Sequence, residues 1–125
     1  HTRLVLYKRI SAAKDNEALK ELQVEMIDRF GLLPEQSQTL FAIHELRFKA
    51  KLLGIRKIDV YEQGGRIIFE QTPNVDSMTL IQLIQNKPAK YKLDGQDKLR
   101  FTDNMPEADD RLLVLNDLLN NLQKN

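Results

Sequence analysis

The chain has 125 residues, of which 42% are hydrophobic and 30% charged, a composition that supports a buried core and excludes general disorder. Its 19 basic and 18 acidic residues leave a net charge of +1, which argues against a dedicated polyanion binder. Because there is no cysteine and there are only two histidines, disulfides, thiolate sites and histidine-rich metal sites are excluded. No apolar run would span a membrane and no signal peptide opens the chain, so we expect a soluble cytoplasmic domain.

The first part of the chain has the apolar period of three helices. The first is short, and Asp15 or Asn16 is the expected N-cap of the second. We expect Gly31 to end the second helix, and Pro34 to open a third that closes at Gly54. The second helix has the strongest apolar stripe, formed by Leu19, Leu22, Met26, Ile27 and Phe30.

The second part of the chain alternates apolar and polar residues, which is typical of strands. Gly64-Gly65 is the expected turn of one hairpin and Asp94-Gly95 that of a second. Between the hairpins, Asp76 is expected to cap a helix, and another helix closes the chain. The predicted order is ααα-ββ-α-ββ-α, an α+β fold.

No internal repeat and no long linker divides this order, so we expect a single domain over residues 1–125. Residues 1–2 are expected to be a terminal remnant that carries no information. The polar residues 120–125 are expected to form a frayed tail.

No set of residues forms a recognisable catalytic centre. A phosphate-cradling loop needs several glycines followed by Lys and Ser or Thr, and Gly64-Gly65 has neither behind it. His44 has no nucleophile or orienting carboxylate beside it, and no serine stands in a hydrolase motif. We therefore expect that this chain is not an enzyme and that it has no cofactor and no metal site.

The second helix carries an acidic face opposite its apolar stripe. At about 100° per residue, Glu17, Glu21, Glu25 and Asp28 fall within about 80° of arc. Like charges at i,i+4 repel by roughly 0.2–0.5 kcal/mol per pair, and a partner surface carrying arginines would relieve this repulsion. The alternative is a solvated helix face, tempered by neighbouring cations such as Arg29.

The hairpin from Lys90 to Arg100 has a second charged face. Strand alternation places Lys90, Lys92, Lys98 and Arg100 on one side of it. Such a face suits phosphate contacts, but no exposed aromatic residue is expected to interleave with it for base stacking. Nucleic-acid binding through this hairpin is therefore the alternative function. The residues expected on the core side are Tyr91, Leu93, Leu99 and Phe101.

Two runs are more specific than a generic helical domain requires, namely RLVLYKRI over 3–10 and EMIDRFGLLP over 25–34. These runs resemble the C-terminal domain of bacterial transcription-repair coupling factor. The resemblance continues through the residues 53–57 and 91–95 and covers nearly the whole chain, weakening in the last helix. The D-R-F-G-x-L-P pattern is its most specific part.

The resemblance implies a parent protein that is a DNA translocase, recognises stalled RNA polymerase and recruits UvrA of nucleotide excision repair. In that family the C-terminal domain packs on an N-terminal UvrB-like module. There it masks the UvrA-binding surface and restrains the motor of the parent protein until polymerase is engaged. The motor itself is not part of the present sequence. We therefore expect a non-catalytic autoinhibitory domain with an intramolecular partner and no direct contact with DNA or membrane.

The resemblance also implies that acidic residues before F-G-L-L-P face arginines of the UvrB-like module. Glu25 and Asp28 occupy those positions, and both belong to the acidic face of the second helix. Glu21 and Arg29 are expected to be neighbours in the same contact. The residues assigned to the core or the turn, and not to the contact, are Phe30, Leu32 and Leu33.

Overall fold

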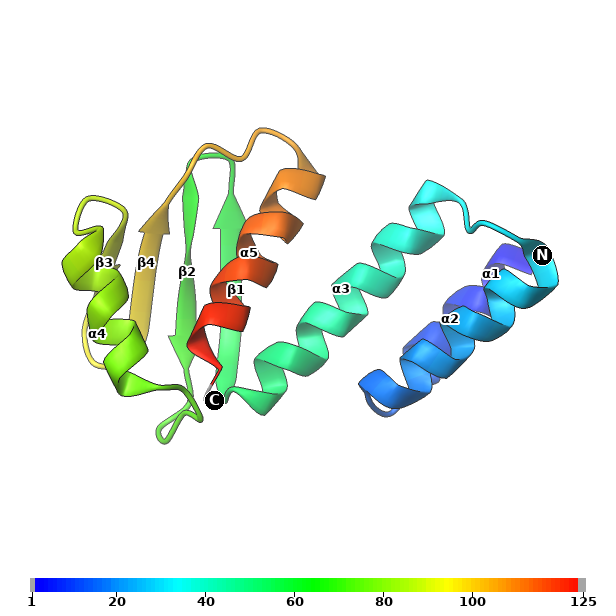
Figure 1. The fold of residues 1–125 in the computed structure, drawn as a ribbon, viewed down its shortest axis with the longest axis horizontal. Coiled ribbons are helices and arrows are strands. Elements are labelled where there is room, and N and C mark those ends of the chain that lie inside the picture. Colours follow the sequence, from blue (N-terminus) through cyan, green and yellow to red (C-terminus); the bar gives the residue numbers. More distant parts are fainter. Residues whose placement is uncertain (1, 124–125) are drawn as a thin grey trace. The chain divides into compact units, whose positions relative to one another are not determined.

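The computed structural model describes residues 2–123, so His1 and residues 124–125 lie outside the described part (Figure 1). The predicted element order and the α+β class are confirmed. No helix within residues 2–123 is both long and apolar enough to cross a membrane. The elements are α1 (Thr2–Ala12), α2 (Asn16–Phe30), α3 (Glu35–Leu52), β1 (Ile55–Tyr61), β2 (Gly64–Phe69), α4 (Ser77–Asn86), β3 (Tyr91–Leu93), β4 (Lys98–Thr102) and α5 (Ala108–Leu122).

The chain divides into two compact units. The first ends at Phe48 and the second begins at Lys49, so the boundary falls within α3. Each unit has its own buried apolar residues. The expectation of a single domain stays a prediction.

The first unit is built on well-defined ends of α2. Of the two candidate N-caps, Asp15 is the one used, because its side chain accepts a 2.8 Å hydrogen bond from the Ala18 N–H. Gly31 ends the helix with φ 78°, a left-handed conformation that favours glycine. The core of this unit consists of Ile10, Leu19, Leu22, Met26, Leu33 and Phe41.

The second unit is an antiparallel sheet of order β1-β2-β4-β3, one face of which is covered by α4 and α5 (Figure 1). Register pairs Ile67 with Leu99 and Tyr91 with Phe101, and all four side chains are buried on the covered face. Leu93 was expected in the core but is 51% exposed, because β3 is a three-residue strand at the edge of the sheet.

The turn of the first hairpin differs from the prediction. Its turn residues are Glu62 and Gln63, and both glycines belong to β2. Close packing explains why glycine stands at both positions. A Cβ on Gly64 would lie 2.3 Å from the carbonyl oxygen of Phe101, and a Cβ on Gly65 would lie 2.8 Å from the Phe101 ring. The glycines therefore permit the close approach of β4 instead of forming the turn.

The last helix continues further than expected. Residues 120–122 were assigned to a frayed tail, but α5 includes them and Leu122 is fully buried. Lys49 Nζ donates hydrogen bonds to Asn116 Oδ1 at 2.7 Å and to Asn120 Oδ1 at 2.8 Å. Core packing and these two bonds hold the final turn.

Replacing Leu119, which is fully buried on α5, tests the core of the second unit. Leu119→Ala is expected to lower the free energy of unfolding by about 2–5 kcal/mol, because it leaves a cavity. The matched control is Leu113→Ala on the same helix, where the side chain is 66% exposed and the change should stay within about 0.5 kcal/mol. Urea denaturation measures both, and equal losses would contradict the assigned orientation of α5.

Candidate functional site

The four residues predicted for partner binding all lie on α2 and do not all point the same way. Glu21, Asp28 and Arg29 are exposed, whereas Glu25 is partly covered and lies on the side of the helix that meets α1. Their positions follow from the burial of the opposite stripe of α2, which turns the acidic face outward. Only Glu25 and Arg29 are brought together, at 4.0 Å between Arg29 Nη1 and Glu25 Oε2.

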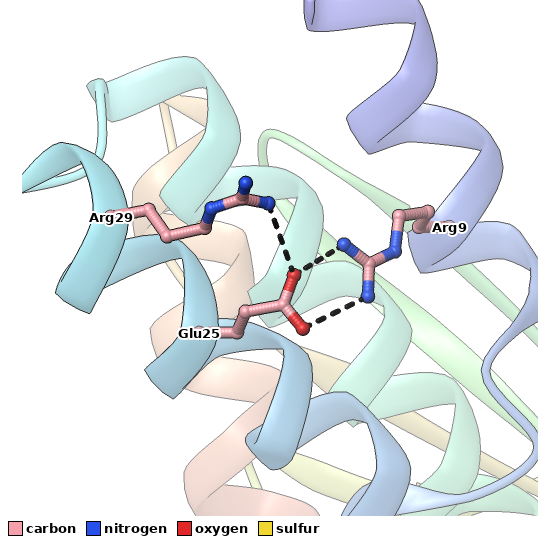
Figure 2. A network of polar contacts seen from close by, with 3 residues as sticks. All are labelled: Arg9, Glu25 and Arg29. Atoms are coloured by element: carbon pink, nitrogen blue, oxygen red, sulfur yellow. Dashed lines mark hydrogen bonds and ion pairs between the residues drawn. The ribbon is translucent and has the colours of Figure 1, made fainter.

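Glu25 already has a strong partner within its own unit (Figure 2). Arg9 of α1 forms a bidentate pair with it, Nη1 donating to Oε2 and Nη2 donating to Oε1 at 3.1 Å. Arg29 approaches the same carboxylate from its other side (Figure 2). The sequence led us to expect that an arginine of another module faces Glu25. Within the domain itself, Arg9 already pairs with this carboxylate.

Arg9 is a site residue that the sequence did not reveal. It stands 16 residues before Glu25, and no helical spacing rule links two positions on different helices. The pairing of α1 with α2 brings the two side chains together. Arg9 lies within the R-L-V-L-Y-K-R-I run, which carried the family resemblance but gave no indication of this contact.

The ion pair shifts the titration of both groups. The hydrogen bond from Arg9 lowers the pKa of Glu25 and, more weakly, so do the charges of Arg9 and Arg29. The same hydrogen bond raises the pKa of Arg9. Since both side chains are exposed to solvent, the pair contributes little to stability, and its main effect is to orient the carboxylate.

Exposed apolar residues lie beside the acidic ones. Val24 is 58% exposed and Ile27 43% exposed, although Ile27 was expected in the buried stripe. Phe30 and Leu32, expected in the core or the turn, are also exposed, whereas Leu33 is buried as predicted. The exposed residues Glu21, Val24, Ile27 and Asp28, together with the partly covered Glu25, are called the α2 surface below.

The cations of the second hairpin lie as expected on one side of the sheet. Register pairs Lys92 with Arg100, and Lys90 forms an ion pair with Asp103 at 3.1 Å. Partial burial is the largest single influence and opposes both charges, but the hydrogen bond between the two side chains and the neighbouring charges together outweigh it, so the pKa of Lys90 is raised and that of Asp103 lowered. The expected lack of an exposed aromatic residue beside these cations is wrong, because Tyr61 of β1 is 52% exposed and lines one hollow together with Lys92 and Arg100.

Comparison with known proteins identifies the family. The TRCF domain model matches residues 1–80. The transcription-repair-coupling factor of Escherichia coli K12 is 42% identical over 125 residues, which are 100% of this chain and 11% of that protein. The Haemophilus influenzae protein of the same name is 44% identical over 117 residues, or 94% of this chain and 10% of that protein. The chain thus spans about a tenth of these relatives.

A solved structure has the same fold. The crystal structure of the C-terminal domain of transcription-repair coupling factor superposes with a TM-score of 0.67 at 20% identity, covering 93% of this chain and 77% of that one. Fold and family model together define a TRCF domain, a class of α+β domain that is not itself a motor. The chain belongs to the transcription-repair coupling factor family.

Within residues 2–123, no three His, Asp or Glu side chains form a group that could hold a metal ion.

The lowered pKa of Glu25 leads to a pH prediction. A carboxyl whose pKa falls on folding contributes stability that is complete above its unfolded pKa and is lost as the pH drops through its folded pKa. In an NMR titration of the Glu25 side-chain carboxyl carbon, Arg9→Gln is expected to move the midpoint upward, because it removes the main cause of the shift. An unchanged midpoint in Arg9→Gln would contradict the bidentate pair.

Proposed function

We propose that this domain is the autoinhibitory clamp of its parent protein and carries out no catalysis itself. It docks through the α2 surface on the UvrB-like N-terminal module and masks the UvrA-binding surface there. It also restrains the translocase until a stalled RNA polymerase is engaged. Membership of the transcription-repair coupling factor family supports this proposal, and the α2 surface supplies a place for the contact.

The observation that carries the proposal is the composition of the α2 surface. Carboxylates of Glu21 and Asp28 stand exposed beside Val24. An apolar patch with a charged border is typical of a docking site. Its charge also suits a reversible contact, because both partners stay hydrated when they separate.

Glu25 is prepared for such a contact by Arg9. A carboxylate has about four acceptor positions, and the bidentate pair with Arg9 takes one on each oxygen. The remaining positions can accept hydrogen bonds from an arginine of the partner without releasing Arg9. We therefore assign Arg9 as a positioning residue that holds Glu25 in the direction of approach.

Substitutions that replace a carboxylate of the α2 surface by an uncharged amide of the same shape test the docking. Asp28→Asn is expected to weaken binding to the separately produced UvrB-like module by roughly 2–5 kcal/mol if the partner arginine is left desolvated. Glu25→Gln is expected to weaken it by about tenfold or more for the same reason. NMR titration of the labelled domain at high concentration measures both, because an intramolecular contact has an effective concentration in the millimolar range.

Glu45→Gln is the matched control, since Glu45 is an exposed acidic residue of the same unit on α3. It should bind as the unsubstituted domain does. In the full-length parent protein, Glu25→Gln and Asp28→Asn should increase UvrA binding in the absence of polymerase. If both variants bind the UvrB-like module with unchanged affinity, the α2 surface is not the docking site.

The role of Arg9 is tested by a double-mutant cycle. Arg9→Ala is expected to weaken docking severalfold, because Glu25 loses its fixed orientation. In a Glu25→Gln background the same substitution should have almost no further effect. An equal loss in both backgrounds would mean that Arg9 contacts the partner directly, and the positioning role would be wrong.

A further inference from the structure

The uncovered face of the sheet in the second unit carries a group of cations. Helices α4 and α5 lie over the other face (Figure 1). Register and strand alternation bring charged side chains from all four strands together on the uncovered side. We call this the open sheet face. Its strand cations are Lys57, Arg66, Lys92, Lys98 and Arg100, and Lys90, which is paired with Asp103, lies just before β3 on the same side.

These cations are only partly neutralised. Arg66 Nε lies 3.2 Å from Asp59 Oδ2, and Arg100 Nη1 lies 4.0 Å from Asp94 Oδ2. Lys92 and Lys98 form no ion pair with any residue in 2–123. The open sheet face therefore keeps a local positive excess, although the whole chain has a net charge of only +1.

A hollow of about 370 Å³ lies within this face. Ligand pockets in proteins commonly have volumes of about 300–1,000 Å³, so the hollow can hold one planar group of nucleobase size. Its lining combines an aromatic ring, polar groups and positive charges. The lining residues used below are Tyr61, Gln63, Lys92, Arg100 and Thr102.

Gly64 explains why the hollow exists. It pairs with Tyr61 on one side and with Thr102 on the other, so two strand spacings, about 9.5 Å, separate these neighbours. A side chain at position 64 would stand between them, and glycine leaves that space empty. A Cβ there would also lie 2.3 Å from the carbonyl oxygen of Phe101. The pairing of β2 with β4 thus requires the same glycine that opens the hollow.

We propose that the open sheet face binds single-stranded nucleic acid, with one base stacked on Tyr61 and its flanking phosphates on Lys92 and Arg100. Single strands are bound by aromatic side chains that accept unpaired bases beside cations that follow the backbone. An acidic protein partner would use the cations but would give no role to the exposed ring. This inference goes beyond the proposed clamp and rests on residues of the other unit.

Binding is measured with fluorescein-labelled (dT)12 and (U)12 by anisotropy at about 50 mM salt, and the comparison of the two strands shows which sugar is preferred. Tyr61→Leu removes the π-face but keeps apolar bulk, and it is expected to weaken binding by about 5- to 150-fold. Tyr61→Phe keeps the ring and should bind like the original chain. Because the chain has three tyrosines and no tryptophan, quenching of tyrosine fluorescence that disappears in Tyr61→Phe reports stacking directly.

The contribution of the cations is measured separately, by the dependence of binding on salt concentration. Lys92→Gln and Arg100→Gln should each lower the slope of log K against log salt by about 0.7, as expected for one lost phosphate contact on a single strand. Lys51→Gln is the control, because Lys51 is an exposed cation at the end of α3 in the same unit. It should leave the slope unchanged. Circular dichroism checks that each variant keeps the fold.

Two results would overturn the inference. The first is the lack of binding of both (dT)12 and (U)12 by the folded chain at low salt. The second is unchanged binding by Tyr61→Leu together with equally strong competition by poly-glutamate. That result would show that the open sheet face is a general anionic-partner surface without base stacking.

Discussion

The proposed docking site depends on one interaction, the packing of the apolar stripe of α2 into the core of the first unit. Leu19, Leu22 and Met26 pack into the core of the first unit, and this packing sets the rotation of α2 about its own axis. A rotation of one residue, about 100°, would bury carboxylates and expose the stripe. The outward direction of Asp28 and the meeting of Glu25 with Arg9 are consequences of hydrophobic burial, which supplies the energy that the exposed ion pair lacks.

The ion pair and the core therefore have different tasks. Arg9 and Glu25 are too exposed for their attraction to stabilise the unit appreciably, since water and salt screen it. Their bidentate geometry instead restricts two flexible side chains to one arrangement. A carboxylate held in this way loses less conformational entropy on meeting a partner, which is how preorganisation strengthens a small interface.

The sequence predicted what depends on local periodicity and missed what depends on long-range pairing. Helix ends at Asp15 and Gly31 followed from capping chemistry, and the element order followed from the change of period. Gly64-Gly65 had the local appearance of a turn, but the approach of β4 explains it. Arg9 and Tyr61 gained their significance only through neighbours that are distant in sequence, and such neighbours leave no spacing pattern.

Net charge illustrates the same distinction. A value of +1 argued against binding to a polyanion, yet the α2 surface is acidic and the open sheet face is basic, and oppositely charged residues elsewhere in each unit balance them in the total. Screening in physiological salt limits each charge to a range of about 8 Å, so a ligand responds to the face it approaches and not to the total. Near-neutrality is therefore compatible with two charged surfaces of opposite sign. The proposed docking through α2 and the proposed binding on the sheet use different residues of different units, so substitutions can be designed for each of them separately.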